Sequence, residues 1–344
     1  MGLHDNSVGF EQSTINEENT MRISLRIALC LFAAGSTLPL QAQDYPSRPM
    51  RMMIPFAPGG ASDLVGRIIQ PRMSEFLGQQ IVVDNRGGAA GNIGVEIAAT
   101  APPDGHTLLL GNIGTMAINP ALYPKFAYQP AKSLTPVTQV VDVPGALVVN
   151  PTLPVKSVKE LVDYAKANPG KLNFGSPGPG SANRLEMEVF TRAAGLKMTH
   201  IPYKGGAGPA VTGLLAGETQ LMFVTLSSSV TFVKAGRLRA LAITSPKRSN
   251  VMPDVPTMLE VGFAGSIGGS WQGVFLPKGT PPAIVNKLFA VMLKVMDQED
   301  VKQRLSTAGV EVIVSKSPAE FAQFVAAQTE KWGKVVVEAG ATAD

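Results

Sequence analysis

Short apolar segments alternate with amphipathic segments along most of this sequence. The apolar segments are rich in Val, Ile, Leu, Met and Phe and are bounded by Gly and Pro, which is typical of buried strands. We therefore predict strands at residues 52–56, 80–83, 107–110, 145–149, 172–174, 199–201, 220–224, 238–244, 272–276 and 311–314. Between them, apolar residues recur with the spacing of a helix face, which predicts helices at 63–77, 93–100, 158–168, 181–194, 209–216, 228–234, 282–296 and 318–338.

This alternation of strand and helix predicts an α/β fold in which helices flank mostly parallel sheets. Hydrophobic residues make up 45% of the chain and charged residues 16%, as in globular proteins. About 300 residues remain after the leader described below, and one hydrophobic core seldom grows that large. The chain is therefore expected to form two domains.

The first 42 residues have the pattern of a leader that is removed from the mature protein. Residues 1–20 are polar and acidic, and we interpret them as the product of an over-long choice of start codon. From Met21 the chain carries two arginines, an apolar stretch at 27–40 and then Ala42, which predicts a cleaved signal peptide at 21–42. The apolar stretch is shorter than the ~20 residues that span a bilayer. We therefore expect export to the periplasm and no membrane anchor.

The only cysteine, Cys30, lies inside this apolar stretch. Leu29 precedes it, where a lipoprotein signal would have a small residue, so we do not expect a lipid anchor. The mature chain then has no cysteine, which excludes disulfides, thiol nucleophiles and metals bound by cysteine.

The formal net charge is +4 for the whole chain and +6 without residues 1–42, which hold two basic and four acidic side chains. A positive exported protein suits an anionic small molecule, although the same charge also serves solubility. The basic residues are dispersed, with no basic run interleaved with aromatic residues. No nucleic acid is therefore expected as a partner.

Four turns that contain Gly, Ser or Thr follow predicted strands and lead into helices; they lie at 56–63, 111–115, 175–181 and 225–229. Ligands of such sheets bind beyond the carboxyl ends of the strands, where these turns lie. Glycine lets the backbone approach a ligand, Ser and Thr provide hydroxyl groups, and a helix N-terminus carries a partial positive charge. Taken singly, each turn is an ordinary helix cap, with Ser62 or Asp63 capping the first helix. Taken together, they predict a pocket that holds an anion by uncharged dipoles.

Catalytic and nucleotide-binding motifs are absent from the sequence, which contains no G-x-S-x-G, H-E-x-x-H, G-x-G-x-x-G or P-loop motif. His106 and His200 are expected to be structural, because isolated histidines without Cys or paired carboxylates seldom form a site. One alternative is a hydrolase or lyase acting on small acids, with Ser62 or Ser181 as the nucleophile. Another is a ligand-sensing module that regulates a partner without any transport.

Eight motifs, which span essentially the whole mature chain, carry a resemblance to a known family. They lie at 45–49, 55–60, 84–94, 103–110, 168–176, 202–206, 253–257 and 271–281, and read YPSRP, PFAPGG, DNRGGAAGNIG, PDGHTLLL, NPGKLNFGS, PYKGG, PDVPT and WQGVFLPKGTP. In this order and spacing they resemble the Bug-type (TctC-like) extracytoplasmic solute receptors of tripartite tricarboxylate transporters.

The resemblance implies a two-lobed periplasmic-binding-protein fold of the Venus-flytrap, type II-like kind. Lobe 1 would be discontinuous, built from 44–143 and 265–344, and lobe 2 would comprise 144–264. Two segments would cross between the lobes, near 140–145 and 265–273. The family also implies a monomer without catalysis, cofactor or metal, which captures a small organic anion such as a mono- or dicarboxylate and delivers it to membrane transporter subunits.

Carried over position by position, the resemblance implies ligand contacts from turns of both lobes. The implied residues are Phe56, Ala57, Pro58, Gly59, Gly60, Ser62, Asp63, Gly111, Asn112, Thr115, Ser176, Gly178, Gly180, Ser181, Arg184 and Thr225. Because the Asp63 carboxylate would repel a bound carboxylate, we expect it to cap the helix or to act through a bridging water.

Two positions depart from the family pattern: Arg184 stands where relatives commonly have His, and Gly87 stands where they usually have Pro. Arg184 either binds a second carboxylate in a bidentate manner, which would favour a dianion, or projects into solvent from its helix. Trp271 either forms a wall of the cleft or packs in the hinge, and we favour packing.

Overall fold

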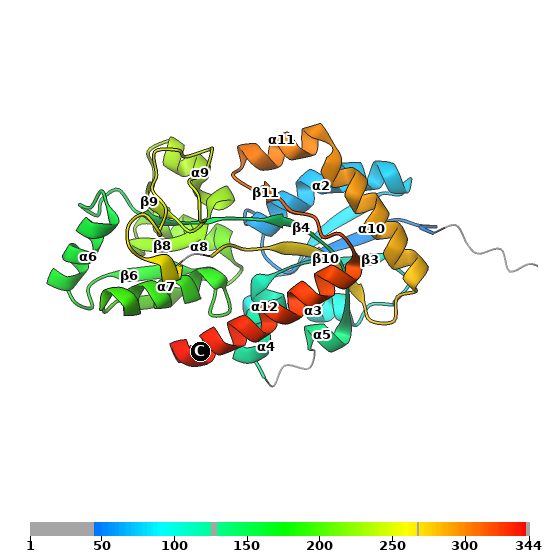
Figure 1. Ribbon diagram of the computed structural model, residues 1–344, viewed down its shortest axis with the longest axis horizontal. Coiled ribbons are helices and arrows are strands. Elements are labelled where there is room, and N and C mark those ends of the chain that lie inside the picture. Colours follow the sequence, from blue (N-terminus) through cyan, green and yellow to red (C-terminus); the bar gives the residue numbers. More distant parts are fainter. Residues whose placement is uncertain (1–44, 125–128, 267, 342–344) are drawn as a thin grey trace, which may run out of the picture. The chain divides into compact units, whose positions relative to one another are not determined.

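The computed structural model describes residues 45–124, 129–266 and 268–341 (Figure 1). The predicted signal peptide and Cys30 lie outside the described residues. Residues Tyr45–Asp344 form one unit, which contains two β-sheets. In the described part of the chain, no helix is both long enough and apolar enough to cross a membrane.

The first sheet has six strands in the order β11-β4-β10-β3-β1-β2. These strands are β1 (Met50–Ile54), β2 (Ile81–Asn85), β3 (Thr107–Asn112), β4 (Leu134–Asp142), β10 (Gln272–Pro277) and β11 (Glu311–Val312). β1 pairs in parallel with β2 and β3, whereas β10 pairs antiparallel with β3 and β4. Leu108 and Leu110 belong to the core on one face, and Leu109 belongs to the core on the other, as the two-residue period of a strand requires. The sheet is therefore buried on both sides.

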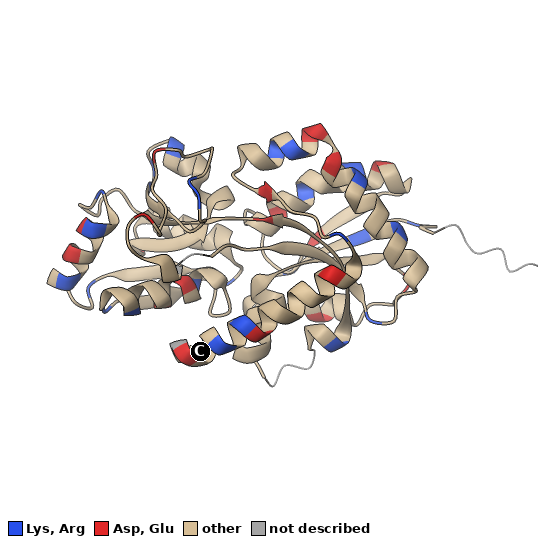
Figure 2. Ribbon diagram, in the orientation of Figure 1, with Lys and Arg blue, Asp and Glu red and all other residues tan. Residues whose placement is uncertain are grey.

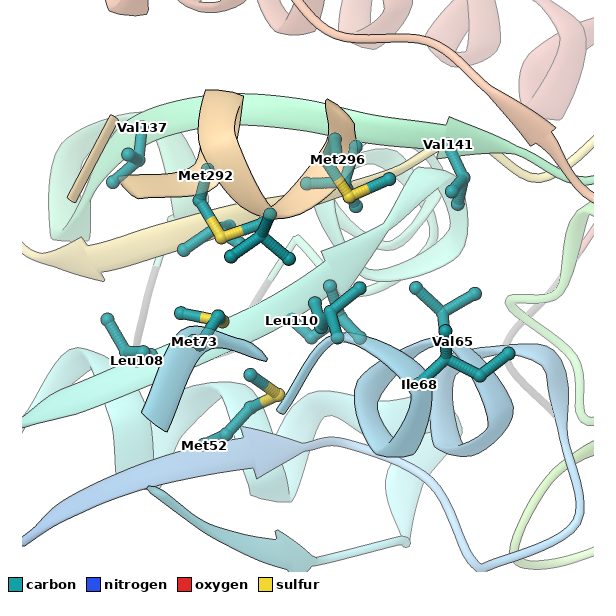
Figure 3. Close-up of a cluster of buried hydrophobic side chains, with 14 of the residues drawn as sticks. Met52, Val65, Ile68, Met73, Leu108, Leu110, Val137, Val141, Met292 and Met296 are labelled. Carbon is teal, nitrogen blue, oxygen red and sulfur yellow. The ribbon is translucent and has the colours of Figure 1, made fainter. Parts of the chain in front are cut away.

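Helices cover both faces of this sheet. They are α2 (Ala61–Leu77), α3 (Asn92–Ala99), α4 (Asn119–Leu122), α5 (Pro130–Ser133), α10 (Pro282–Asp297), α11 (Glu299–Thr307) and α12 (Pro318–Ala339), with the short turns η1 (Ala89–Gly91) and η2 (Gly114–Ile118). On one face, Met52 and Leu110 of the sheet share a core with Ile68 of α2 and Met292 of α10 (Figure 3). On the other face, α3, η2 and α12 enclose the second core. We call this sheet with its helices lobe 1.

The second sheet has five strands in the order β7-β6-β8-β5-β9. They are β5 (Gly145–Val149), β6 (Asn173–Ser176), β7 (Thr199–Pro202), β8 (Leu221–Thr225) and β9 (Arg239–Ile243). Its helices are α6 (Val158–Ala167), α7 (Ala182–Ala194), α8 (Ala207–Ala216) and α9 (Leu226–Lys234), followed by the turn η3 (Ala264–Ser266). Two further cores fill the two faces, one under α6 and α7 and the other under α8 and α9. We call this sheet with its helices lobe 2.

Every strand and helix predicted from the sequence is present, with ends shifted by a few residues. β4, α5, α11, the segment from η2 to α4 and the short turns η1 and η3 are additional. Pro136, Thr138 and Gln139 interrupt the apolar pattern of β4, and η2 is a π-helical turn that lacks the usual 3.6-residue period.

The expectation of mostly parallel sheets is wrong, because both sheets are mixed. Among the described residues, five of the nine strand pairs are antiparallel. The reason is that β5 and β10 each enter their sheet directly from the other lobe. Each therefore runs against its neighbours, whereas strands that return through a helix within the same lobe run parallel.

Two segments cross between the lobes, as predicted, and run side by side in Figure 1. They also pair with each other through an antiparallel bridge between Pro144 and Gly269, which the sequence analysis did not predict. Val143 N donates to Ser270 O (3.2 Å) and Ser270 N donates to Val143 O (2.9 Å). Thr244 of lobe 2 joins both segments, because its Oγ1 accepts from Gly145 N (2.8 Å) and donates to Gly268 O (2.6 Å). The hinge is therefore a hydrogen-bonded pair of strands and not two independent linkers.

Trp271, at the end of the returning segment, is only 3% exposed. Its ring packs edge-on against Phe321 and Phe324 of α12, with centroid distances of 5.9 and 5.4 Å. This packing fixes the start of β10 against the C-terminal helix, and it agrees with the interpretation of Trp271 as a packing residue.

We predict that Trp271→Ala lowers the free energy of unfolding by about 3–5 kcal/mol, because it removes a large buried side chain and leaves a cavity. Urea unfolding followed by circular dichroism measures this loss. A variant with wild-type stability but impaired solute binding would instead place Trp271 in the cleft.

Candidate functional site

A small cavity, here called the inner chamber, lies where the two lobes meet. Its water-accessible volume is about 50 Å³, which is room for roughly four water molecules or one carboxylate-sized group. Lobe 1 lines it with Phe56, Gly60, Ala61, Ser62, Ala90, Asn112, Ile113 and Gly114, lobe 2 lines it with Pro177, Gly180, Ser181, Ala182, Asn183, Ala207 and Thr225, and the hinge contributes Ser270. None of these lining residues carries a charge.

Four helices begin at this chamber. The N-cap residues are Gly60 for α2, Ser181 for α7, Gly206 for α8 and Thr225 for α9. Only Ser181 uses its side chain as a cap, accepting from Arg184 N (3.2 Å), so the first N–H groups of the other three helices are not consumed by side-chain caps. Aligned helix dipoles and unused N–H groups favour an anion.

Asp63 shapes the first turn without lining the chamber. Its Oδ2 accepts from Gly59 N (3.1 Å), and its Oδ1 accepts from Arg67 Nε (2.9 Å) and Asn85 Nδ2 (3.1 Å). The same Asn85 amide donates to Phe56 O (3.0 Å). The predicted N-cap at Ser62 or Asp63 is wrong, because α2 already begins after Gly60; the Asp63 carboxylate instead ties the helix back to the turn that precedes it.

The residues between Phe56 and Gly60 meet the other lobe instead of the chamber. Ala57 N donates to Gly205 O of lobe 2 (2.8 Å). Gly208 in the first turn of α8 lies so close that a Cβ built on it would be 2.6 Å from the Pro58 carbonyl oxygen. Gly59 lies against Gly208 as well. The two lobes therefore approach through backbone contacts that only glycine permits.

The Gly-containing turn that precedes α7 of lobe 2 is supported by Ser176 and His200. Ser176 Oγ accepts from Gly178 N (3.1 Å) and lies 2.6 Å from His200 Nε2, while the His200 ring stacks on Phe174. Ser181 Oγ donates to Gly178 O (2.8 Å). Burial and, secondly, the charge of the nearby Arg184 lower the pKa of His200 to about 4. His200 is therefore a neutral support of this turn.

The third turn closes the chamber through Asn112. Thr115 N donates to Asn112 Oδ1 and Asn112 N donates to Thr115 Oγ1, both at 3.1 Å, so the two side chains fix each other. Thr115 is fully buried and Gly111 lies against Phe275 in the sheet. Of Gly111, Asn112 and Thr115, only Asn112 lines the chamber, together with Ile113 and Gly114 of the same turn.

Ala90, which the sequence motifs did not single out as a site residue, adopts a left-handed backbone conformation with φ of 54°. Asn119 holds it there by donating from Nδ2 to Ala90 O (3.0 Å). Gly180 of lobe 2 packs against the same place, since a Cβ on it would lie 1.9 Å from Asn119 Oδ1 and 3.2 Å from Ala90 Cβ. The strained turn at Ala90 therefore fits against Gly180 of the other lobe, where any side chain would collide with Asn119.

The comparisons with known proteins agree with this architecture. The family described as "Tripartite tricarboxylate transporter family receptor" matches residues 65–341. The chain is also similar to Protein BugT of Bordetella pertussis, with 36% identity over 324 residues that cover 94% of this chain and 99% of the relative.

The chain belongs to the tripartite tricarboxylate transporter receptor family.

Two solved structures extend the match to the fold of this receptor. One is the periplasmic binding protein BugD, with a TM-score of 0.83 and 35% identity, covering 87% of this chain and 99% of BugD. The other is MatC from Rhodopseudomonas palustris with bound malate, with a TM-score of 0.80 and 35% identity, covering 85% of this chain and all of that structure (100%). The two-lobed fold predicted from the sequence is confirmed, and the receptor is a solute-binding protein of this family.

The structure brings seven of the sixteen predicted site residues to the inner chamber of the receptor: Phe56, Gly60, Ser62, Asn112, Gly180, Ser181 and Thr225. The other nine do not line it: Ala57, Pro58, Gly59, Asp63, Gly111, Thr115, Ser176, Gly178 and Arg184. The other nine lining residues were not singled out one by one: Ala61, Ile113, Gly114 and Pro177 lie within the predicted turns, Ala182 and Asn183 begin the helix that follows Ser181, and Ala90, Ala207 and Ser270 lie outside these segments. The start of α8 after Gly205-Gly206 follows the same turn pattern as the others, and that signal would have indicated Ala207.

The structure agrees with neither of the two alternatives for Arg184, which were contact with a second carboxylate and projection into solvent. Its side chain is 8% exposed, so it does not project into solvent, and it does not line the inner chamber. It lies behind the chamber wall, where Nη1 donates to Pro179 O (3.3 Å) and Nε lies 3.7 Å from Glu188 Oε1. The guanidinium thus supports the turn before α7 from below.

A buried carboxyl lies behind the lining residue Asn183. Asn183 Nδ2 donates to Glu186 Oε2 (3.3 Å), and Glu186 is only 3% exposed. A Cβ on Gly268 of the hinge would lie 2.3 Å from Glu186 Oε1, so this carboxyl packs directly on the crossing segment. Burial and, in addition, the charge of Asp142 raise the pKa of Glu186 to about 7. Burial also raises the pKa of Asp142.

We predict that Glu186 makes the receptor less stable as the pH rises from 4.5 to about 7. The folded state keeps the proton up to the raised pKa, whereas the unfolded chain releases it near the ordinary value of 4.5. The contribution is therefore complete below pH 4.5 and is lost as the pH rises through 7. In thermal unfolding across this pH range, the melting temperature of the wild type should fall as the pH rises. The Glu186→Gln variant should not show this fall.

Glu299→Gln, at an exposed position, is the matched control and should keep the wild-type pH profile. Because Asp142 titrates in the same direction, the informative quantity is the difference between wild type and each variant. If the melting temperatures of wild type and Glu186→Gln changed with pH in parallel, this result would contradict the prediction that Glu186 stays protonated in the folded protein.

Proposed function

We propose that this receptor captures a small carboxylate between its two lobes in the periplasm and delivers it, chemically unchanged, to the membrane subunits of a tripartite transporter. The observation that carries the proposal is the convergence of four helix N-termini on one small chamber with an uncharged lining. Such a chamber binds a carboxylate through N–H and hydroxyl dipoles. The malate bound to the related MatC agrees with this chemistry.

The finer features of the sequence analysis belong to the same proposal. Lobe 1 comprises 44–143 and 265–344, lobe 2 comprises 144–264, and the receptor acts as a monomer after removal of the signal peptide at 21–42. Lys and Arg residues are interspersed with Asp and Glu over the described helices (Figure 2). The net positive charge then attracts anions to the protein, and the neutral chamber binds them.

The geometry offers little to an enzyme that would attack a small acid. Ser181 Oγ already donates to Gly178 O and accepts from Arg184 N, so its hydroxyl acts as a helix cap. Ser176 and His200 form a serine–histidine pair, but Ser176 is fully buried and does not line the chamber. We therefore propose binding without catalysis.

A thermal-shift panel of mono- and dicarboxylates tests the proposed function. Succinate and malate are paired with succinamide, which keeps the carbon skeleton of succinate but has no charge. We expect a bound acid to raise the melting temperature by about 5 °C at a concentration about 100-fold above its Kd, and the diamide to leave it unchanged. A panel in which no acid shifts the transition, or in which the diamide shifts it equally, would refute the proposal.

Closure of the lobes on the solute predicts a distinct effect of Gly208→Ala. Alanine favours the helix α8, so lobe 2 keeps its stability, but the new Cβ would lie 2.6 Å from the Pro58 carbonyl of lobe 1. Overpacking of this kind costs about 1–3 kcal/mol, so we expect the affinity for the acid that binds best to fall by about 10- to 100-fold. Isothermal titration calorimetry measures the change.

Gly333→Ala is the matched control, because Gly333 also lies inside a helix and a Cβ on it would meet nothing within 4 Å. This variant should bind as the wild type does. Equal affinities for wild type and Gly208→Ala would show that binding does not require the close approach of the lobes.

A further inference from the structure

A second and larger cavity, here called the outer chamber, adjoins the inner chamber. Its water-accessible volume is about 400 Å³, compared with about 50 Å³ for the inner chamber. The two cavities share Phe56, Ala90 and Pro177 as lining residues, so these three lie at the boundary between them. Both lobes contribute to the outer chamber, as they do to the inner one.

The inner chamber is too small for an entire solute with a carbon chain. A cavity needs about 10–15 Å³ of this volume for each water, so the inner chamber takes one carboxylate head and little more. An acid whose carboxylate binds in the inner chamber must therefore extend its carbon chain past this boundary. The outer chamber offers the space for that chain.

At the boundary between the chambers, the Phe56 ring is closely enclosed and two alanines adopt unusual backbone conformations. A Cβ on Gly91 would lie 3.0 Å from Phe56 Cζ, and one on Gly206 of lobe 2 would lie 3.2 Å from Phe56 Cδ1, so the Phe56 ring is held between two glycines. Ala89 and Ala90 both adopt positive φ values, of 46° and 54°. Backbone strain in residues other than glycine concentrates at ligand clamps.

The lining of the outer chamber indicates the chemistry of its occupant. Pro177, Pro179 and Pro202 provide apolar surface beside the glycines of both turns. Lys204 is the one charged residue among those that line it, and Lys204 is exposed to solvent. This arrangement suits an apolar chain that ends in a second anionic group.

We propose that the outer chamber binds the apolar chain of a long dicarboxylate, whose first carboxylate lies in the inner chamber and whose second lies beside Lys204. This assignment rests on the proposed function, because it requires the inner chamber to hold a carboxylate. It makes the receptor selective for chain length: the carbon chain crosses the boundary beside Phe56 and Ala90, and Lys204 recognises the far end of the solute.

Calorimetric titrations with succinate, adipate, suberate and octanoate test the proposal. Each buried methylene should raise the affinity by up to about fourfold, so the order should be suberate, adipate, succinate. Lys204→Gln should weaken suberate by about threefold, as for a solvent-exposed ion pair, and leave octanoate unchanged. Lys234→Gln, at an exposed position outside both chambers, is the matched control and should bind suberate as the wild type does.

Equal affinities for the three diacids, or tighter binding of succinate, would overturn the outer chamber as a solute site while leaving the proposed function intact. A Lys204→Gln variant that loses succinate and suberate equally would overturn the role of Lys204 at the far end. Failure of every acid to bind would overturn the proposed function and this inference together.

Discussion

The close approach of two backbones across the interlobe cleft is the constraint on which this site depends. Ala57 N donates to Gly205 O, and a Cβ on Gly114 of lobe 1 would lie 3.0 Å from Gly180 O of lobe 2. A side chain at such positions would collide with the backbone of the other lobe. Because the turns meet without side chains between them, the helices that begin at those turns direct their N-termini into one small volume.

The chamber has the electrostatic character of a binding site for an anion that must later leave. Its lining carries dipoles and no formal charge. A buried arginine facing the solute would hold a carboxylate by a charge-assisted bidentate contact, which is stronger than contacts to neutral donors. In this receptor Arg184 supports the turn from behind, where it hydrogen-bonds the Pro179 carbonyl. In the proposed site, recognition would therefore depend on the shape of the turns, which hydrogen bonds such as those from Gly59 N to Asp63, Thr115 N to Asn112 and Gly178 N to Ser176 hold in place.

The hinge and the chamber are connected through a few buried polar groups. Thr244 bonds to both crossing segments, and Glu186 lies between the hinge and Asn183 of the chamber wall. Two carboxyls of raised pKa, Glu186 and Asp142, therefore lie against the crossing segment, beside Gly268 and Gly269. A ligand shifts the lobes toward closure only through contacts that the open form lacks.

The sequence by itself determined the local elements and the class of protein. Apolar periodicity predicted the strands and helices, and the motifs from YPSRP to WQGVFLPKGTP indicated the family that the comparisons confirm. It also located the turns, because Gly, Ser and helix starts leave a local pattern. It did not predict β4, whose polar residues are buried only by its neighbours, or the antiparallel entry of β5 and β10, which follows from the crossing between lobes.

Only the tertiary structure decided which side of each turn meets the chamber. Ser62 lines it and Asp63 does not, although they are neighbours, because successive residues of a helix point in different directions. Ala90 and Ser270 reach the chamber through the packing of elements that are distant in the sequence, and no local pattern marks them. Arg184 is buried because the body of lobe 2 surrounds it. Spacing along the chain fixes which residues share an element, whereas the placement of the two lobes fixes which of them face one another.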